Sequence, residues 1–250
     1  MNPAQGWEIV SGGATARVDR QLRSTQVVKL QYPDCFDPDL TRCELQREFD
    51  IYQILPKHPR LLQLCPGSTP QRLILPYLPN GTLQDRLENH EAPLNDEQRA
   101  LLGTDAAEAV AVLHENQVVH GDLQPRNFML TDENRLCLID FAGSTLRNDK
   151  GTAIESVRYF LPRPIEDLPS VRTDLFALGS VLYAIFSGRA PYADKSDEEV
   201  VRLFGARQFP STDDILCGNE VRGCWTGSYC SAKQIFEDLT AYCAELQDQN

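Results

Sequence analysis

The early part of the chain carries short apolar runs that are bounded by turn residues. The runs E-I-V, A-R-V and V-V-K-L lie within residues 7–30, and residues 73–83 begin with a further run, L-I-L. Runs of this kind, separated by small or polar residues, are typical of strands. Between them, residues 37–55 carry apolar side chains at helical spacing, and Asp37 or Asp39 can cap that helix. This part is therefore predicted to be a sheet with one helix, and residues 73–83 are predicted to form a strand, a hinge and a turn.

Helical patterns dominate the rest of the chain. Asn95 begins a helix, and Gln98 stands three residues later, in the pattern of a capping box. Residues 175–186 form an apolar helix that ends where glycine and proline follow, and residues 233–246 form the last helix. The apolar run 175–186 is also the longest in the chain, and it is too short to cross a bilayer.

One β-hairpin is predicted to gather the chemically active side chains. Residues 128–131 and 136–139 are apolar and joined by a polar turn. Antiparallel pairing sets Asn127, which precedes the first strand, beside Asp140, which follows the second. Asp122 lies five residues upstream of Asn127, in a loop with glycine and proline. Two carboxylates and an amide then meet at one end of the hairpin, which suits Mg²⁺ and leaves one carboxylate free to orient a hydroxyl.

Charge and cysteine usage narrow the function classes. A length of 250 residues allows one large domain or two small lobes with an ample core. The net charge of -12 argues against nucleic acid or an anionic membrane as the main partner, and it is compatible with a basic peptide substrate. The eight cysteines include no C-x-x-C pair and fit no zinc pattern, and residues 1–6 do not resemble a signal peptide. Reduced thiols in the cytoplasm or nucleus are the simplest interpretation.

The hairpin and its upstream loop resemble the catalytic centre of eukaryotic protein kinases. Residues 120–127 read H-G-D-L-Q-P-R-N, and D-F-A-G begins at Asp140, whereas the family has H-R-D-x-x-x-x-N followed by D-F-G. Residues 11–18 resemble the family's glycine-rich loop, residues 142–163 a short activation segment, and residues 174–186 the central helix of the larger lobe. The resemblance covers about residues 7–246, with a flavour close to small serine/threonine kinases of filamentous fungi.

This resemblance implies an α+β fold of two lobes, with a β-rich N-lobe over residues 1–78 and a helical C-lobe over residues 79–250. It also implies ATP and Mg²⁺ as ligands and a protein as the other substrate. Lys29 would hold the phosphates, and a glutamate of the first helix, Glu48 rather than Glu44, would pair with Lys29. The other residues that the resemblance places around the nucleotide are Gly12, Gly13, Val18, Tyr77 and Leu78.

The same resemblance assigns the chemistry of transfer. Asn127 and Asp140 would bind Mg²⁺, and Asp122 would orient the accepting hydroxyl and take its proton. Gln124 stands where the family has a lysine that neutralises the moving phosphoryl group. Arg126 lies where tyrosine kinases carry an arginine with that task, and we expect it to compensate.

Three further departures concern regulation and folding. Gly121 replaces the arginine of H-R-D, so the chain is of the non-RD type and a phosphorylated activation segment has lost that partner. Ala142 replaces the glycine of D-F-G and leaves Asp140 intact. Arg163 replaces a glutamate whose usual arginine partner is also missing, and this loss indicates a tolerated variation in the fold and says little about catalysis.

Three functions fit these residues. The first is transfer of the γ-phosphate of ATP to a serine or threonine hydroxyl of a protein, since every catalytic group is present; Arg126 is the one hint of tyrosine specificity. The second is a pseudokinase that serves as a regulatory binding module, which the altered motifs favour. The third is a small-molecule phosphotransferase, because H-G-D-x-x-x-x-N also resembles aminoglycoside and choline kinases.

Overall fold

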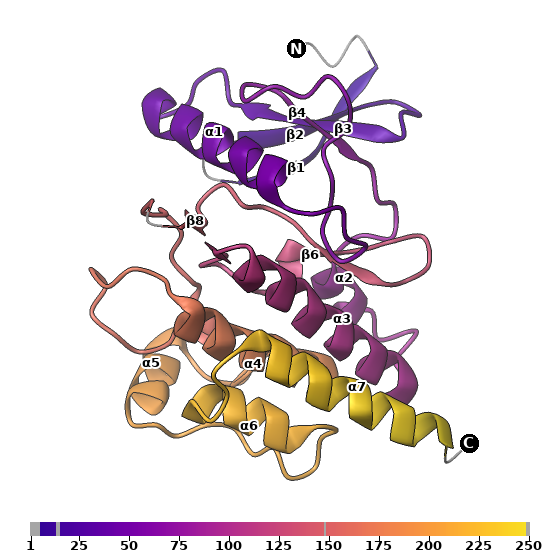
Figure 1. Ribbon diagram of the computed structural model, residues 1–250, viewed down its shortest axis with the longest axis vertical. Helices are drawn as coiled ribbons and strands as arrows, with labels where there is room; N and C mark the ends of the chain where they lie inside the picture. Colours follow the sequence, from indigo (N-terminus) through magenta and orange to yellow (C-terminus); the bar gives the residue numbers. More distant parts are fainter. Residues whose placement is uncertain (1–5, 14–15, 148, 249–250) are drawn as a thin grey trace.

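A four-stranded sheet at one end of the molecule and a helical region at the other make an α+β fold of two lobes (Figure 1). The computed structural model describes residues 6–13, 16–147 and 149–248. This is the fold that the resemblance implied. The boundary between residues 78 and 79 stays a prediction.

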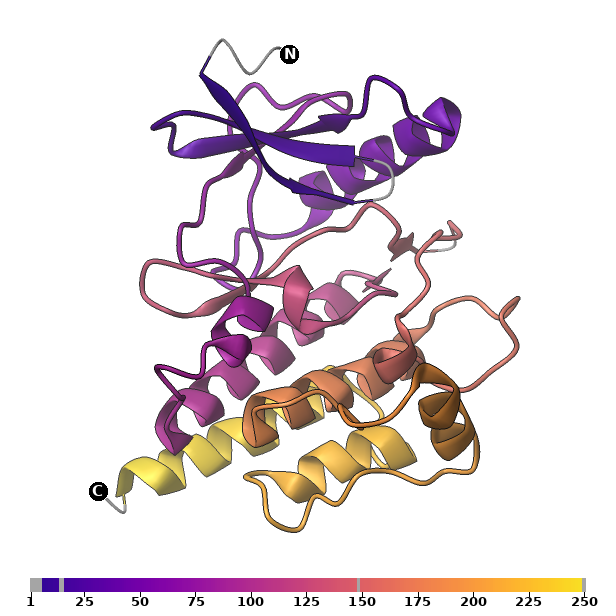
Figure 2. The ribbon, with the colours of Figure 1, turned by 180° about the vertical axis from the view of Figure 1, so that it is seen from behind.

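The sheet is antiparallel and follows the order of the chain. Its strands are β1 (Trp7–Gly12), β2 (Ala16–Gln21), β3 (Gln26–Gln31) and β4 (Leu73–Pro76). The helix α1 (Pro38–Ile54) lies across one face of the sheet, and Figure 2 shows the other face. Asp37 is the cap of α1, because its side chain accepts from the amide of Leu40, so the first of the two predicted caps is the one used.

The helical region is built around one buried helix. Its helices are α2 (Leu83–Glu88), α3 (Asp96–Glu115), α4 (Val171–Ser187), α5 (Asp197–Gly205), α6 (Gly218–Thr226) and α7 (Ala232–Asp248). Residues 173–186 of α4 are all buried, because α3 packs on one side and α6 on another. A helix that is apolar all round requires such an environment. Gly179 allows α6 to approach, since a side-chain carbon there would lie 2.5 Å from Cβ of Cys224.

Short strands connect the two regions. The hairpin of β6 (Phe128–Leu130) and β7 (Leu136–Leu138) lies between the sheet and the helices, and β5 (Val118–Val119) pairs with β8 (Thr145–Leu146). Two short 3-10 helices, η2 (Pro125–Asn127) and η3 (Val157–Tyr159), precede β6 and follow β8. Among the described residues, no helix combines the length and apolarity that crossing a membrane requires.

The sequence patterns identified the long helices and missed three short ones. The predicted start at Asn95 agrees with α3, and Asn95 and Gln98 form the predicted capping box, whereas α4 begins at Val171, ahead of the predicted Leu175. We did not predict α2, α5 and α6, which are six, nine and nine residues long. Of these, α2 and α5 begin with a capping box, at Thr82 and at Ser196, so a local signal was present even though the apolar stripe was too short to reveal them.

Candidate active site

The hairpin brings Asn127 and Asp140 together as predicted. Phe128 pairs with Leu138, and the amide of Ile139 donates to the carbonyl of Asn127 at 3.0 Å. Asp140 follows directly and adopts a left-handed backbone, with φ at 68°. Its side chain is 46 % exposed, so one face of the carboxylate is open for a ligand.

The loop before the hairpin surrounds Asp122 with hydrogen-bond donors. The side-chain nitrogen (Nδ2) of Asn127 donates to the backbone carbonyl of Asp122 at 2.7 Å and to its carboxylate at 3.1 Å. The Gln124 amide donates to the other carboxylate oxygen, and the Arg126 guanidinium lies 3.5 Å from Asp122. Burial raises the pKa of the Asp122 carboxyl above its ordinary value, which favours proton uptake by this group.

A buried carboxylate of α4 binds the backbone of this loop and holds it in place. Asp174 accepts from the backbone amides of His120 at 2.8 Å and Gly121 at 2.9 Å, and the His114 ring lies 2.9 Å from it. The sequence pattern indicates only that Asp174 begins an apolar helix, and it does not predict these contacts. Gly121 has φ at +75°, and a side-chain carbon there would lie 3.1 Å from Ala153. The backbone itself therefore favours glycine at this position.

Lys29 lies between two carboxylates on opposite sides of the site. Its ammonium is 2.7 Å from Glu48 of α1 and 2.6 Å from Asp140. Burial opposes the charge on Lys29, but Asp140 and Glu48 outweigh that effect and raise the pKa of the ammonium. In turn, Lys29 lowers the pKa of Asp140, so both groups are held charged. Glu48 is thus the pairing glutamate, and Glu44 instead accepts from the hydroxyl of Thr152 at 2.7 Å.

Aromatic contacts connect α1 to the catalytic loop. The ring of Phe141 packs edge-on against Tyr52 at 5.1 Å and against His120 at 5.7 Å between centroids. The His120 ring also accepts from the amide of Asp122 and bonds the carbonyl of Ile139. A shift of α1 would therefore be transmitted through Phe141 and His120 to the position of Asp122.

The structure describes part of the loop that we expect to contact the nucleotide. Gly12 ends β1, the amide of Gly13 donates to the carbonyl of Ala16, and Val18 faces Lys29 across the β2–β3 pair. Ala14 and Thr15 of the predicted loop lie outside the described residues.

In the connection after β4, Tyr77 serves the fold. Its amide donates to the carbonyl of Thr25 at 2.8 Å, and the Arg20 guanidinium lies 3.5 Å from its ring centroid.

Arg163 of the activation segment forms an ion pair that the family motif does not predict. Both members of the family's usual ion pair are absent, which we interpreted as a tolerated variation in the fold. Instead, Arg163 pairs with the buried carboxylate of Glu155 at 2.8 Å. Gln124, read as a lost cation, also has a structural task, because its amide oxygen accepts from the hydroxyl of Ser156 at 3.1 Å. Neither contact is visible in the spacing of the motifs.

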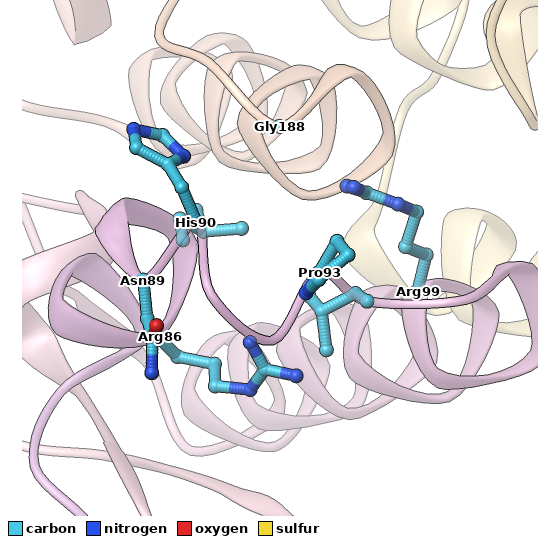
Figure 3. Close-up of a pocket in the computed structure, with 8 residues that line it drawn as sticks. Arg86, Asn89, His90, Pro93, Arg99 and Gly188 are labelled. Carbon is cyan, nitrogen blue, oxygen red and sulfur yellow. The ribbon is translucent and has the colours of Figure 1, made fainter.

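A cavity of about 110 Å³ lies outside this cluster, between the α2–α3 connection and the end of α4 (Figure 3). The residues that line it include Arg86, Asn89, His90, Pro93, Arg99 and Gly188. Arg86 donates to the carbonyl of Ala92, and Arg99 donates to that of Ile185. These bonds secure the connection and the end of α4, so they account for both arginines without a ligand.

The cluster around Asp122 and Asp140 is suited to phosphoryl transfer. Asn127 uses its amide nitrogen on Asp122, which directs its oxygen away from that group, and Asp140 is charged and partly exposed. Oxygen donors of this kind fit Mg²⁺. Lys29 carries a fixed positive charge, and the carboxyl of Asp122 has a raised pKa. The two-lobe fold and this site define a protein of the kinase class.

Comparison with known proteins identifies the family. Residues 8–229 match the family model described as protein tyrosine and serine/threonine kinase. The chain belongs to this family. It is 30 % identical over 246 residues to U-box domain-containing protein 33 of Arabidopsis thaliana, with 92 % of this chain and 28 % of that protein covered.

Two further relatives are named as kinases. Serine/threonine-protein kinase 12 of Arabidopsis thaliana is 26 % identical, covering 82 % of this chain and 47 % of that protein. Aurora kinase B of Mus musculus is 28 % identical, covering 74 % and 54 %. The chain thus spans about half of these two relatives and less of the first.

Proposed function

We propose that this chain transfers the γ-phosphate of ATP to a serine or threonine hydroxyl of a protein substrate. One observation carries the proposal: a charged lysine of β3 and the partly buried carboxyl of Asp122 lie beside two oxygen-bearing side chains, Asn127 and Asp140, at the end of one hairpin. The names of two relatives, serine/threonine-protein kinase 12 and Aurora kinase B, agree with protein phosphorylation.

Each residue has a distinct task in this proposal. Lys29, oriented by Glu48, holds the phosphates, and Asn127 and Asp140 would hold Mg²⁺, which neutralises phosphate charge when bound. Asp122 orients the hydroxyl and accepts its proton. Arg126, whose side chain is 64 % exposed, extends from the loop and supplies a positive charge to the moving phosphoryl group.

The nucleotide would lie between the sheet and the hairpin. Gly12 and Gly13 would cover the phosphates, and Val18 would contact the base. The carbonyl of Pro76 and the amide of Leu78 are the hinge groups we assign to adenine. We assign Tyr77 a supporting role, because its amide and ring are used by Thr25 and Arg20.

Cysteine usage and charge bear on the cellular setting. The scattered cysteines and the net charge of -12 support a cytoplasmic or nuclear protein that does not act mainly on nucleic acid or membranes.

The test is transfer of labelled γ-phosphate to histone in the presence of Mg²⁺. Wild type is compared with Asp122→Ala and Asp140→Ala, and with Asp132→Ala as a matched control at the exposed far end of the hairpin. We expect Asp122→Ala to lose at least about 100-fold in kcat, in line with loss of a general base, and Asp140→Ala to lose activity because a ligand of Mg²⁺ is removed, while the control keeps its activity. Wild type that binds Mg-ATP and transfers nothing would identify a pseudokinase.

A further inference from the structure

Arg163 contacts several groups at the end of the activation segment. Its guanidinium is 2.8 Å from Glu155, donates to the carbonyls of Leu161 and Asp167, and lies 4.5 Å from the ring centroid of Phe160. The Glu155 side chain is 0 % exposed and the Arg163 side chain 11 %. A carboxylate so buried is costly unless it is paired, so the pair fixes Glu155 to the end of the segment.

Fixing Glu155 also fixes the groups that reach Asp122. Ser156 follows Glu155 directly, and its hydroxyl donates to the Gln124 amide oxygen. The nitrogen of the same amide donates to the Asp122 carboxylate. Because Gln124 is buried and bonded at both ends, the orientation of its amide depends on Ser156 remaining in place. A continuous line of bonds thus leads from Arg163 to Asp122.

The start of the segment is held by backbone contacts. The amides of Thr152 and Ala153 both donate to the carbonyl of Gly143, at 2.9 and 3.0 Å. Ala153 then covers Gly121, where a side-chain carbon would lie 3.1 Å from both Ala153 and Pro169. A side chain at position 121, where the family has a phosphate-pairing arginine, would therefore crowd Ala153 and Pro169 from its first carbon.

We propose that Arg163 is a positioning residue, which through Glu155, Ser156 and Gln124 orients Asp122 and makes transfer independent of phosphorylation of the activation segment. This inference rests on the proposed function. It assigns to an ion pair within the segment the task that a phosphate and the arginine of H-R-D share in other members of the family.

The first experiment compares Arg163→Ala with Arg172→Ala, a matched change at a nearby exposed arginine. Both proteins are treated with phosphatase and assayed with Mg-ATP and histone. We expect Arg163→Ala to lose at least about ten-fold in kcat, because Gln124 no longer holds Asp122, with KM for ATP within about two-fold of wild type. We expect Arg172→Ala to match wild type. Unchanged kcat in Arg163→Ala, or equal loss in both variants, would overturn the proposal.

A double variant separates positioning from general destabilisation. Arg163→Met combined with Glu155→Leu leaves no unpaired buried charge, so apolar contact can hold the segment. We expect it to recover kcat to within about three-fold of wild type. Hydrogen exchange adds a readout without transfer: in Arg163→Ala, exchange should rise in residues 151–160 and stay unchanged in α7. A uniform rise across the chain would mean a merely structural role.

Phosphatase treatment of wild type completes the test and distinguishes the two proposals. We expect the treated protein to transfer phosphate at a rate within two-fold of the untreated protein. Transfer that disappears on treatment would refute the inference while supporting the proposed function. If neither sample transfers phosphate, the proposed function fails, and the hydrogen exchange of residues 151–160 still decides whether Arg163 holds the segment.

Discussion

Replacing Asp174 by asparagine should loosen the catalytic loop from the central helix. The carboxylate accepts from the amides of His120 and Gly121, one on each oxygen, and the His114 ring lies beside the first oxygen. Asparagine has one acceptor oxygen and one NH₂ group. Whichever way its amide turns, an NH₂ group faces at least one buried backbone N–H, which then lacks an acceptor.

The expected size follows from these bonds. An unsatisfied buried donor costs about 1–3 kcal/mol, and loss of the charge weakens the remaining bonds. We therefore expect the free energy of unfolding of Asp174→Asn to fall by about 2–4 kcal/mol. For a chain of this size, that loss lowers Tm by roughly 5–15 °C.

The assay is urea and thermal unfolding of Asp174→Asn beside Asp214→Asn, which makes the same change at an exposed carboxylate. The control should unfold as wild type does. A loss below about 0.5 kcal/mol in Asp174→Asn, the range of ordinary surface changes, would refute the assignment of Asp174 as the anchor of the loop.

Three further predictions concern the site. Gln124→Ala removes a bond to the Asp122 carboxylate, worth about 1.5–3 kcal/mol, so kcat should fall about ten-fold or more; steady-state kinetics with kcat unchanged would contradict this. Burial raises the pKa of Asp122, so this carboxylate is protonated and stops acting as a base as the pH falls through that raised value. The acid limb of kcat against pH should therefore lie above the ordinary carboxyl range near pH 4. A limb at or below about pH 4 would contradict this. Gly121→Arg, which restores the family residue, should cost about 1–2 kcal/mol or more in urea unfolding because of the left-handed backbone and the approach of Ala153; a neutral or stabilising result would exclude this reasoning.

Local patterns predicted those parts of the fold that depend on near neighbours in sequence. Two short apolar runs and the polar turn between them predicted the hairpin, and antiparallel pairing then required Asn127 and Asp140 to meet. Caps at Asp37 and Asn95 were readable because a cap and its target are three residues apart.

Contacts between distant segments could not be read in this way. Ser156 and Gln124 are separated by 32 positions, so nothing in the loop sequence indicates that Gln124 bridges Asp122 to the activation segment. Arg163 was interpreted by comparison with the family's ion pair, whereas its partner lies eight positions upstream within the same segment. The conformation of the segment brings these two charges together. The pair forms because a buried Glu155 carboxylate without a partner would be costly.

Transfer of labelled phosphate by wild type and Asp122→Asn tests the central claim most directly. Asn keeps the size of the side chain and removes the base, so both proteins should be stabilised equally by Mg-ATP. We predict that wild type labels serine or threonine in histone and that Asp122→Asn is slower by at least about 100-fold. Equal labelling by the two proteins, or binding of Mg-ATP without labelling by either, would contradict the account.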